Sequence, residues 1–536
     1  MSAVKKVFPL VVTFFCLFSS PLAAAVKVPS IDAELKEDWQ KQKLVPARRS
    51  SDEVFLRRVW LNAAGRVPDF QEVVAFSADK APDKRAKLIE KVLSSPEFAD
   101  MLAMRMSDMF RVKSEFPINL WPNAVQAYHR YLRDAVMNNT RWNVLARDLI
   151  TSSGSNFREA QINFMRAAAN RSPEGLANCA ALSFMGVRLE RVPEAERAKF
   201  ANFFSRAAYK STDEWKEEIV FTGGDAGTVE VGDLSGRHWT IEFPARDPRE
   251  EFAEWLLAPE NPYFAGAFVN RTWGWLFGSG IIDPPDDMPV VRSGWRKFAD
   301  AVTFADVHEP EVRMASTQKA LEKIFRKSGY DIKQLFRVIM NSEAYQADWR
   351  PASGMDTAKS SKYFASYPVR RMEAEVIIDM LAKITGRYEK YSSVIPEPFT
   401  FLPDKYPSVK IADGSILSVT LEKFGRPPRD SGKWEERNNR ITVSQRQHLM
   451  NSGKLYSGLS TFAQRVARAY IRDRKNGDRR RVDYIYMTML SRRATDKEYQ
   501  IIKNYRRKLP DRKAQKRIWT DLIWSIANGT EFLYYH

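Results

Sequence analysis

The sequence predicts a mainly α-helical protein, with two multi-helix domains of short helices and a small β-hairpin or meander element between them. Over most of the chain, apolar residues recur three or four positions apart, as they do on one face of a helix. Strict alternation of apolar and polar residues, with glycine-rich turns, is confined to residues 217–243. The chain has 536 residues, 44% of them hydrophobic, which is enough for a large core.

The first 25 residues have the order of a secretory signal peptide. A basic start precedes the apolar run VFPLVVTFFCLF and a segment of small residues that ends at Ala25. This run is shorter than the roughly 20 apolar residues that span a bilayer, and no later stretch is long and apolar enough. We therefore expect residues 1–25 to be removed, the mature chain to lack a transmembrane segment, and the protein to be periplasmic, secreted or displayed at the cell surface.

Helix start and stop signals place the first helical domain over residues 26–205. Ser51 stands before an apolar-periodic run as an N-cap does, and Gly65 follows that run as a C-terminal glycine does. Further helices are expected after Asp69 and over residues 83–93. The alternating segment then forms a β element within residues 206–245.

The second helical domain is expected over residues 246–536, with a loop-rich insertion at 387–436. Thr495 and Glu498 form a capping-box pattern that predicts the start of a late helix. The phrases VLSSPEF, VIMNSEAY and SIANGTEF each join an apolar helix end to a polar stop and an aromatic residue. We interpret them as helix junctions whose aromatic side chain packs inward.

The chain carries a large positive charge, +18 overall and +16 without Lys5 and Lys6 of the signal peptide. In a cytosolic protein such a charge points to nucleic acid, but export excludes that partner here. The polyanions outside the cytoplasm include anionic polysaccharides and other envelope polymers. The alternative is a basic surface that serves solubility alone.

Cysteine and histidine usage indicates neither a cofactor nor a metal site. Cys179 is the one cysteine beyond the signal peptide, so no internal disulfide forms, and we interpret it as a small buried side chain. None of the five histidines has a recognised zinc spacing: they are His129, His238, His308, His448 and His536.

The densest group of candidate site residues lies at 270–287. Asn270, Arg271 and Trp273 are followed by a turn with three carboxylates, Asp283, Asp286 and Asp287. Paired carboxylates serve acid–base chemistry on glycosidic bonds, and an indole face suits a pyranose ring. The alternative is structural: Asp283 precedes a proline in the turn, Asp286 or Asp287 caps the next segment, and Arg271 pairs with one of the carboxylates. Trp273 and Trp275 point to different sides of a helix, so one is expected in the core.

A second group of candidates consists of the loop arginines Arg426, Arg429 and Arg437. Few acidic residues are near them in the sequence, so we expect them to face an anion such as sulfate or carboxylate. In RRMEAEVIID, by contrast, we expect Arg371 and Glu375 to form an ion pair one helical turn apart.

Several long phrases resemble a known family. FLRRVWLNAAGRVPDFQEVVAF and DKRAKLIEKVLSSPEF resemble domain of unknown function 1549 of planctomycete-type exported proteins, which is associated with surface cytochromes. REEFAEWLLAPENPYFAGAFVNRTWGWLFGSGIIDPPDDM, YPVRRMEAEVIIDMLAKITG and WSIANGTEFLYYH resemble its companion, domain of unknown function 1553. The resemblance implies export and a mainly helical fold over residues 31–536, and it implies no particular reaction.

The sequence departs from that family where many members attach haem. In those members, the phrase resembling FMGVRL is followed by two cysteines and a histidine, which bind the porphyrin and its iron. Here ERVPEAERAKF follows Leu189, without cysteine or histidine. A haem-associated oxidoreductase is therefore disfavoured.

Two functions stay open at this point. The first is an exported, non-redox binding protein for anionic glycans. The alternative is a carbohydrate-active enzyme that uses the carboxylates at Asp283–Asp287. No phosphate-binding loop and no serine-hydrolase motif is present to suggest another chemistry.

The absent haem motif makes a spectroscopic prediction. We expect protein exported from a host that matures c-type cytochromes to show no Soret band, because Cys179 alone cannot make two thioether bonds. An absorbance scan of the denatured protein checks this, and haem absorbance that survives denaturation would contradict it.

Overall fold

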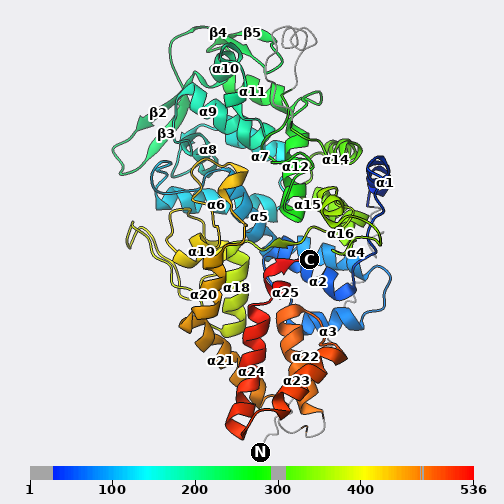
Figure 1. Cartoon of the computed structure of the whole chain (residues 1–536). Helices are drawn as coiled ribbons and strands as arrows, with labels where there is room; N and C mark the ends of the chain where they lie inside the picture. The colour runs from blue at the N-terminus through cyan, green and yellow to red at the C-terminus, as the bar shows by residue number, and fades with distance from the viewer. Residues whose placement is uncertain (1–27, 291–309, 471–472, 474–475) are drawn as a thin grey trace, which may run out of the picture.

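Helix boundaries in the computed structural model follow the capping signals of the sequence (Figure 1). The structure describes residues 28–290, 310–470, 473 and 476–536. The Ser51 hydroxyl accepts a hydrogen bond from the Val54 amide, and α2 (Asp52–Ala64) ends at Gly65, whose φ is 63°. Thr495 and Glu498 form a capping box at the start of α23 (Asp496–Arg507). The mainly α-helical class is thus confirmed, with its predicted caps in place.

The first half of the chain is a set of short helices joined by tight turns. Besides α2, they are α1 (Asp32–Lys41), α3 (Phe70–Ala78), α4 (Lys84–Leu93), α5 (Pro96–Met109), α6 (Pro122–Met137), α7 (Trp142–Thr151), α8 (Asn163–Arg166), α9 (Pro173–Ala180) and α10 (Glu194–Ala201). A π-helical turn, η2 (Ala181–Met185), continues α9, and the 3₁₀ turns are η1 (Ala160–Ile162), η3 (Leu189–Arg191) and η4 (Asn202–Phe204).

The β element consists of two separate antiparallel hairpins at one end of the molecule, at the top of Figure 1. In the first, β2 (Ala207–Ser211) pairs with β3 (Glu218–Thr222), and β1 (Gly154–Ser155) from the first half adds to the other edge of β3. In the second, β4 (Gly227–Gly232) pairs with β5 (His238–Phe243), so that Val231 lies opposite Trp239.

The second half is again helical. Its helices are α11 (Pro248–Leu257), α12 (Phe264–Phe277), α14 (Ala315–Lys327), α15 (Ile332–Asn341), α16 (Glu343–Gln346), α17 (Thr357–Lys362), α18 (Ala374–Thr385), α19 (Val419–Lys423), α20 (Val443–Asn451), α21 (Gly453–Arg468), α22 (Gly477–Leu490), α24 (Arg512–Ala527) and α25 (Thr530–Leu533). The segment 387–436 holds only α19 and the 3₁₀ turns η5 (Ser408–Lys410) and η6 (Trp434–Glu436).

The three repeated phrases are helix junctions, as predicted. They join α4 to α5, α15 to α16 and α24 to α25. Their aromatic residues Phe98, Tyr345 and Phe532 are all buried. The junctions therefore turn the chain while adding large side chains to the core.

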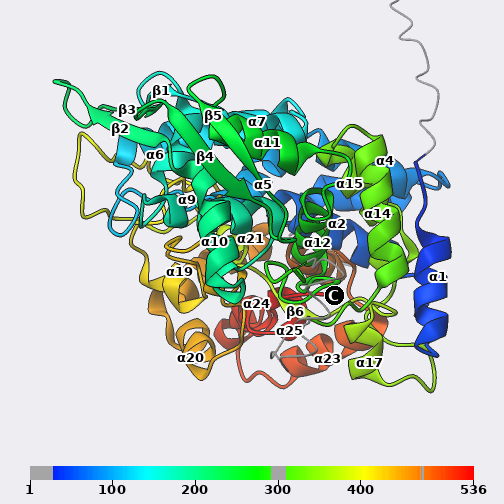
Figure 2. The ribbon, with the colours of Figure 1, turned by 90° about the horizontal axis from the view of Figure 1, so that it is seen from above.

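The two halves of the chain interlock. α1 packs along α14 of the second half, as the view from above shows (Figure 2). At the centre, β6 (Arg370–Arg371) pairs with β7 (Tyr534–Tyr535), which places the C-terminal residues beside α2. One continuous cluster of buried apolar residues extends from Ile31 to Tyr535.

Two buried arginines of α2 link the chain segments that meet at this centre. Arg57 donates hydrogen bonds to the carbonyl oxygens of Met489 (2.7 Å) and Phe532 (3.0 Å). Arg58 donates to the carbonyl oxygens of Ala347 and His536 at 3.0 and 3.1 Å, and also to that of Tyr345. Burial lowers the pKa of Arg57 to about 10.

The predicted signal peptide lies outside the described residues. Among the helices that are described, none has both the length and the apolar composition that crossing a bilayer demands.

The buried arginines generate a stability prediction. We expect Arg58→Ala to lower the free energy of unfolding by about 3 kcal/mol, because it leaves several buried carbonyl oxygens without a donor. Chemical denaturation followed by circular dichroism measures this. Arg130→Ala, at an exposed position of α6, is the matched control, and an equal loss in both variants would contradict the prediction.

Candidate functional site

A cavity of about 700 Å³ lies between α5, the C-terminal end of α12 and the loop at 427–440. We call it the arginine cavity because basic side chains dominate its lining. The six basic residues are Arg105, Arg271, Arg370, Lys433, Arg437 and Arg440, and the four acidic residues are Asp108, Asp283, Glu373 and Glu435. Two indoles, Trp275 and Trp434, also line it.

The turn after α12 forms one wall of the arginine cavity. Gly278 ends the helix with a φ of 93°, and a Cβ there would collide with the side chain of Arg370. The Asn270 side chain holds the turn by hydrogen bonds to the backbone oxygen and nitrogen of Ile282, at 2.8 and 2.9 Å. Glycine and asparagine at these positions therefore fix where Asp283 lies.

Glu373 is the centre of one ion-pair network in the lining. It pairs with Arg105 at 3.1 Å and Arg370 at 3.5 Å, and it accepts a hydrogen bond from the Tyr535 hydroxyl. Burial alone would raise the pKa of this carboxyl, but the charges of Arg370 and Arg105 lower it to about 2. Glu373 is thus an anion that the fold itself neutralises.

Arg437 is the centre of a second network. It donates to Asp108 at 2.7 Å and to Glu375 at 2.7 Å, bridging α5 and α18. Burial opposes the charged form of Arg437, yet Asp108 and Glu375 raise its pKa well above its ordinary value. This guanidinium is therefore committed to protein carboxylates.

Arg271 differs from these paired arginines. It is only 4% exposed, and it donates one hydrogen bond, from Nη2 to the Leu182 carbonyl at 3.1 Å. Across residues 28–290 and the later described segments, no carboxylate oxygen lies within 4 Å of it. Burial lowers its pKa; Asp286 opposes this shift, whereas Arg111 and Arg188 add to it. Arg271 is therefore a buried cation in the cavity lining that acts with Asp286 only at a distance and has no direct carboxylate partner among the described residues.

Other polar atoms of the lining lack partners as well. Buried Nε atoms of Arg105 and Arg370 and the buried Oδ1 of Asn439 make no hydrogen bond. Arg440 is exposed and, in the described part of the chain, has no carboxylate partner. Of these groups, the exposed Arg440 guanidinium is the one whose donors a ligand can reach.

The three predicted carboxylates do not share the arginine cavity. Asp283 lines it and pairs with Arg313 at 2.9 Å. Asp286 is fully buried, where it accepts hydrogen bonds from Arg188 at 2.9 Å and from the Trp434 amide at 2.7 Å. Asp287 is buried and paired with Arg191. Each carboxylate thus pairs with an arginine, but that arginine is Arg313, Arg188 or Arg191, whereas the structural alternative expected Arg271.

The aromatic candidates divide between core and cavity. Trp273 is fully buried and stacks on Phe277 with 4.3 Å between ring centroids. Trp275, two residues later, lines the arginine cavity. The candidate Trp273 is thus a core residue, and Trp275 is also buried, at 7% exposed, although it lines the cavity. Asn270 is also fully buried.

The prediction that the loop arginines face an anion site is wrong for two of the three. Arg426 is buried and donates to the carbonyl oxygens of Ile416 (2.8 Å) and Asp413 (2.6 Å). Arg429 is buried and pairs with Asp108 at 2.8 Å. Neither lines the cavity, because backbone carbonyls and a carboxylate from α5 surround them. Arg437 does line it.

The expected ion pair between Arg371 and Glu375 is wrong. α18 begins at Ala374, so Arg371 precedes the helix and instead donates to the carbonyl oxygens of Phe424 (2.7 Å) and Asn438 (3.0 Å). The same phrase contained two lining residues that sequence reasoning missed, Arg370 and Glu373. Their signal was an arginine and a glutamate three residues apart, just before a helix.

The remaining candidates lie elsewhere. Cys179 is a free thiol that packs against the core but is half-buried, not buried as expected. His129 is buried against the Ser107 hydroxyl at 2.9 Å, and burial lowers its pKa to about 3. His308 lies outside the described residues.

Glu373 generates a pH prediction. The pKa of its carboxyl is 4.5 without these partners, as in the unfolded chain, and about 2 in the folded protein. The unfolded state therefore binds more protons between these values, and stability falls as the pH decreases through that window. We expect Glu373→Gln to show a shallower fall than the parent, measured as denaturation midpoints against pH. The exposed Glu435→Gln is the control and is expected to follow the parent.

Two family models match the two halves of the chain. The family model PSCyt2, a protein of unknown function (DUF1549), matches residues 30–192. The model PSD1, a protein of unknown function (DUF1553), matches residues 248–291 and 319–506. No curated protein and no solved structure matches the chain.

The arginine cavity lies where the two matched regions meet. Arg105 and Asp108 fall in the first match, and Arg271 and Arg437 fall in the second. The chain belongs to the family that combines these two domains of unknown function.

Proposed function

We propose that the protein is an exported, non-redox binding protein whose arginine cavity holds an acidic group of an anionic glycan. The observation that carries this proposal is Arg271, a buried guanidinium that lines the cavity without a carboxylate partner among the described residues. A buried charge without a counter-ion is costly. A ligand anion beside Arg271 offsets that cost, which is a direct source of affinity.

The type of anion follows from the donor. A guanidinium presents planar pairs of N–H groups that match the oxygens of a carboxylate or a sulfate. Arg440 adds a second unpaired guanidinium at the exposed side of the cavity. Arg105 and Arg370 already neutralise Glu373, so they contribute shape more than charge.

The indoles support a sugar in place of a simple inorganic ion. Trp275 and Trp434 line the same cavity as Arg271. A Cβ on Gly274 would lie 3.0 Å from the Trp434 ring, so the absence of a side chain there lets the indole approach α12. Flat aromatic faces pack against the C–H face of a pyranose. The combination of cation and indole suits an acidic saccharide.

Charge and location agree with this class of ligand. The chain without its predicted signal peptide has a net charge of +16, which attracts polyanions over distance. Glycans bearing carboxylate or sulfate are polyanions that an exported protein meets. The proposed binding protein needs no redox cofactor and no hydrolytic carboxylate pair.

The proposal predicts salt-sensitive binding that depends on Arg271. We expect heparin, as a sulfated probe, to bind the parent at low salt and to bind Arg271→Gln about tenfold more weakly, the loss of one charge-assisted contact. Affinity should also fall steeply as salt rises, because bound counter-ions are released on binding. Isothermal titration calorimetry at several salt concentrations measures both effects.

Arg130→Gln is the matched control because it removes the same charge from an exposed helix position. Arg440→Gln is an exposed cavity variant that does not disturb the core and is expected to weaken binding too. Equal binding by all four proteins, or equal binding of heparin and neutral dextran at low salt, would refute the proposal.

A further inference from the structure

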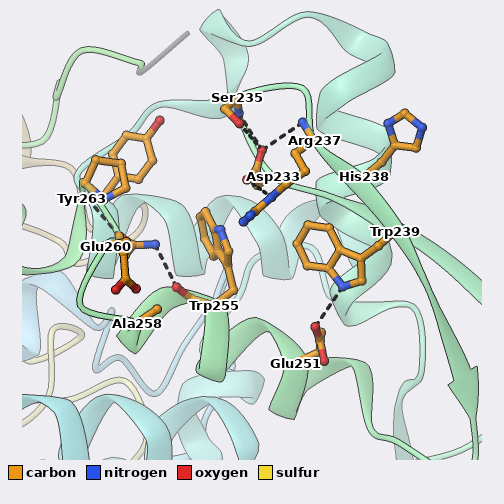
Figure 3. Close-up of a pocket in the computed structure, with 12 residues that line it drawn as sticks. Asp233, Ser235, Arg237, His238, Trp239, Glu251, Trp255, Ala258, Glu260 and Tyr263 are labelled. Carbon is orange, nitrogen blue, oxygen red and sulfur yellow. Dashed lines mark hydrogen bonds and ion pairs between the residues drawn. The ribbon is translucent and has the colours of Figure 1, made fainter. Parts of the chain in front are cut away.

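A second pocket, of about 820 Å³, lies between the β4–β5 hairpin and α11 (Figure 3). It shares no lining residue with the arginine cavity. Figure 3 shows the indoles of Trp239, from β5, and Trp255, from α11, on either side of the same space. We call it the tryptophan pocket.

The two indoles are held in position from behind. Trp255 stacks on Phe203 with 6.5 Å between ring centroids, and Trp239 meets the same ring edge-on at 5.7 Å. The Trp239 indole N–H donates to Glu251 at 2.9 Å, and Glu251 in turn pairs with Arg246 at 2.6 Å. Both indoles nevertheless remain partly exposed where they line the pocket.

Polar groups surround the indoles. The buried Asp233 carboxylate organises the hairpin turn by accepting hydrogen bonds from Ser235 at 2.7 Å and from Arg237 Nε at 3.2 Å. The other guanidinium nitrogens of Arg237 have no acceptor in the described structure. Glu260 is exposed at the opposite side of the pocket, and no basic partner lies within 4 Å of it among the described residues. Figure 3 shows His238 directed away from this space.

The charge of this lining selects against two ligand classes. Carboxylates of Asp233, Glu251 and Glu260 face one guanidinium, so an anionic ligand is repelled here, in contrast to the arginine cavity. A cation would bind by covering an indole face. Arg237 already lies over the Trp239 ring, 5.3 Å from its centroid, and competes for that position.

We infer that the tryptophan pocket binds an uncharged pyranose residue of a polysaccharide. The indole faces of Trp239 and Trp255 pack against the C–H groups of the ring. Glu260 accepts hydrogen bonds from ring hydroxyls, and Arg237 donates to them. This site goes beyond the proposed function, because it takes a neutral sugar and stands on residues that the arginine cavity does not use.

Native affinity electrophoresis of the full mature chain tests the inference. The gels contain hydroxyethylcellulose, soluble starch, laminarin or galactomannan as neutral probes. We expect at least one polymer to retard the parent, and Trp255→Ala to abolish that retardation. Glu260→Ala, an exposed substitution that leaves the core intact, is expected to raise the dissociation constant about tenfold, as the loss of hydrogen bonds to a charged group does.

Two controls separate this site from other effects. Trp215→Ala removes an indole that is 56% exposed and lies outside the pocket, so it should keep the parent's retardation. Arg271→Gln should keep it as well, which distinguishes this site from the arginine cavity. The inference is overturned if no neutral polymer retards the parent, or if Glu260→Ala and a folded Trp255→Ala migrate as the parent does. Choline binding that requires Trp255, without any polysaccharide binding, would likewise overturn it in favour of a cation site.

Discussion

Buried arginine side chains hold this fold together, and those of Arg57 and Arg58 do so at its centre. Both lie on α2, and their N–H groups donate hydrogen bonds to carbonyl oxygens near the ends of α16, α22 and α25 and to that of His536. Those carbonyls are left without a helical partner wherever a short helix stops. A protein made of many short helices has many such helix ends, and one guanidinium can donate hydrogen bonds to the carbonyl oxygens of several of them at once.

The same chemistry builds the arginine cavity. Arg437 and Glu373 each bind groups from both halves of the chain, so the cavity walls are cross-linked by ion pairs. Arg271 is the exception among these paired arginines. It is a buried charge that no described carboxylate pairs with directly, and Asp286 offsets its burial only in part, a cost typical of a binding site.

The sequence was sufficient for the fold class and for local features, and insufficient for long-range pairing. Ser51, Gly65 and the Thr495–Glu498 pair act within a few residues, so their roles were predictable. Arg429 seemed to lack an acidic partner because Asp108 is more than three hundred positions away. Arg371 was misplaced because α18 begins three residues after it, at Ala374, which removed its expected partner one turn along the helix. Of the sequence candidates, Arg271, Asp283 and Arg437 line the arginine cavity, whereas the lining residues Arg105 and Arg440 carried no recognisable motif.

The pairing of β7 with β6 has a consequence for biosynthesis. Residues 530–536 supply Phe532, Tyr535 and the His536 carbonyl to the surroundings of α2, which is made near the start of the chain. A ribosome makes α2 early and residues 530–536 late, so the two segments are released far apart in time. The middle of the molecule therefore closes only after residues 530–536 have been made, long after α2.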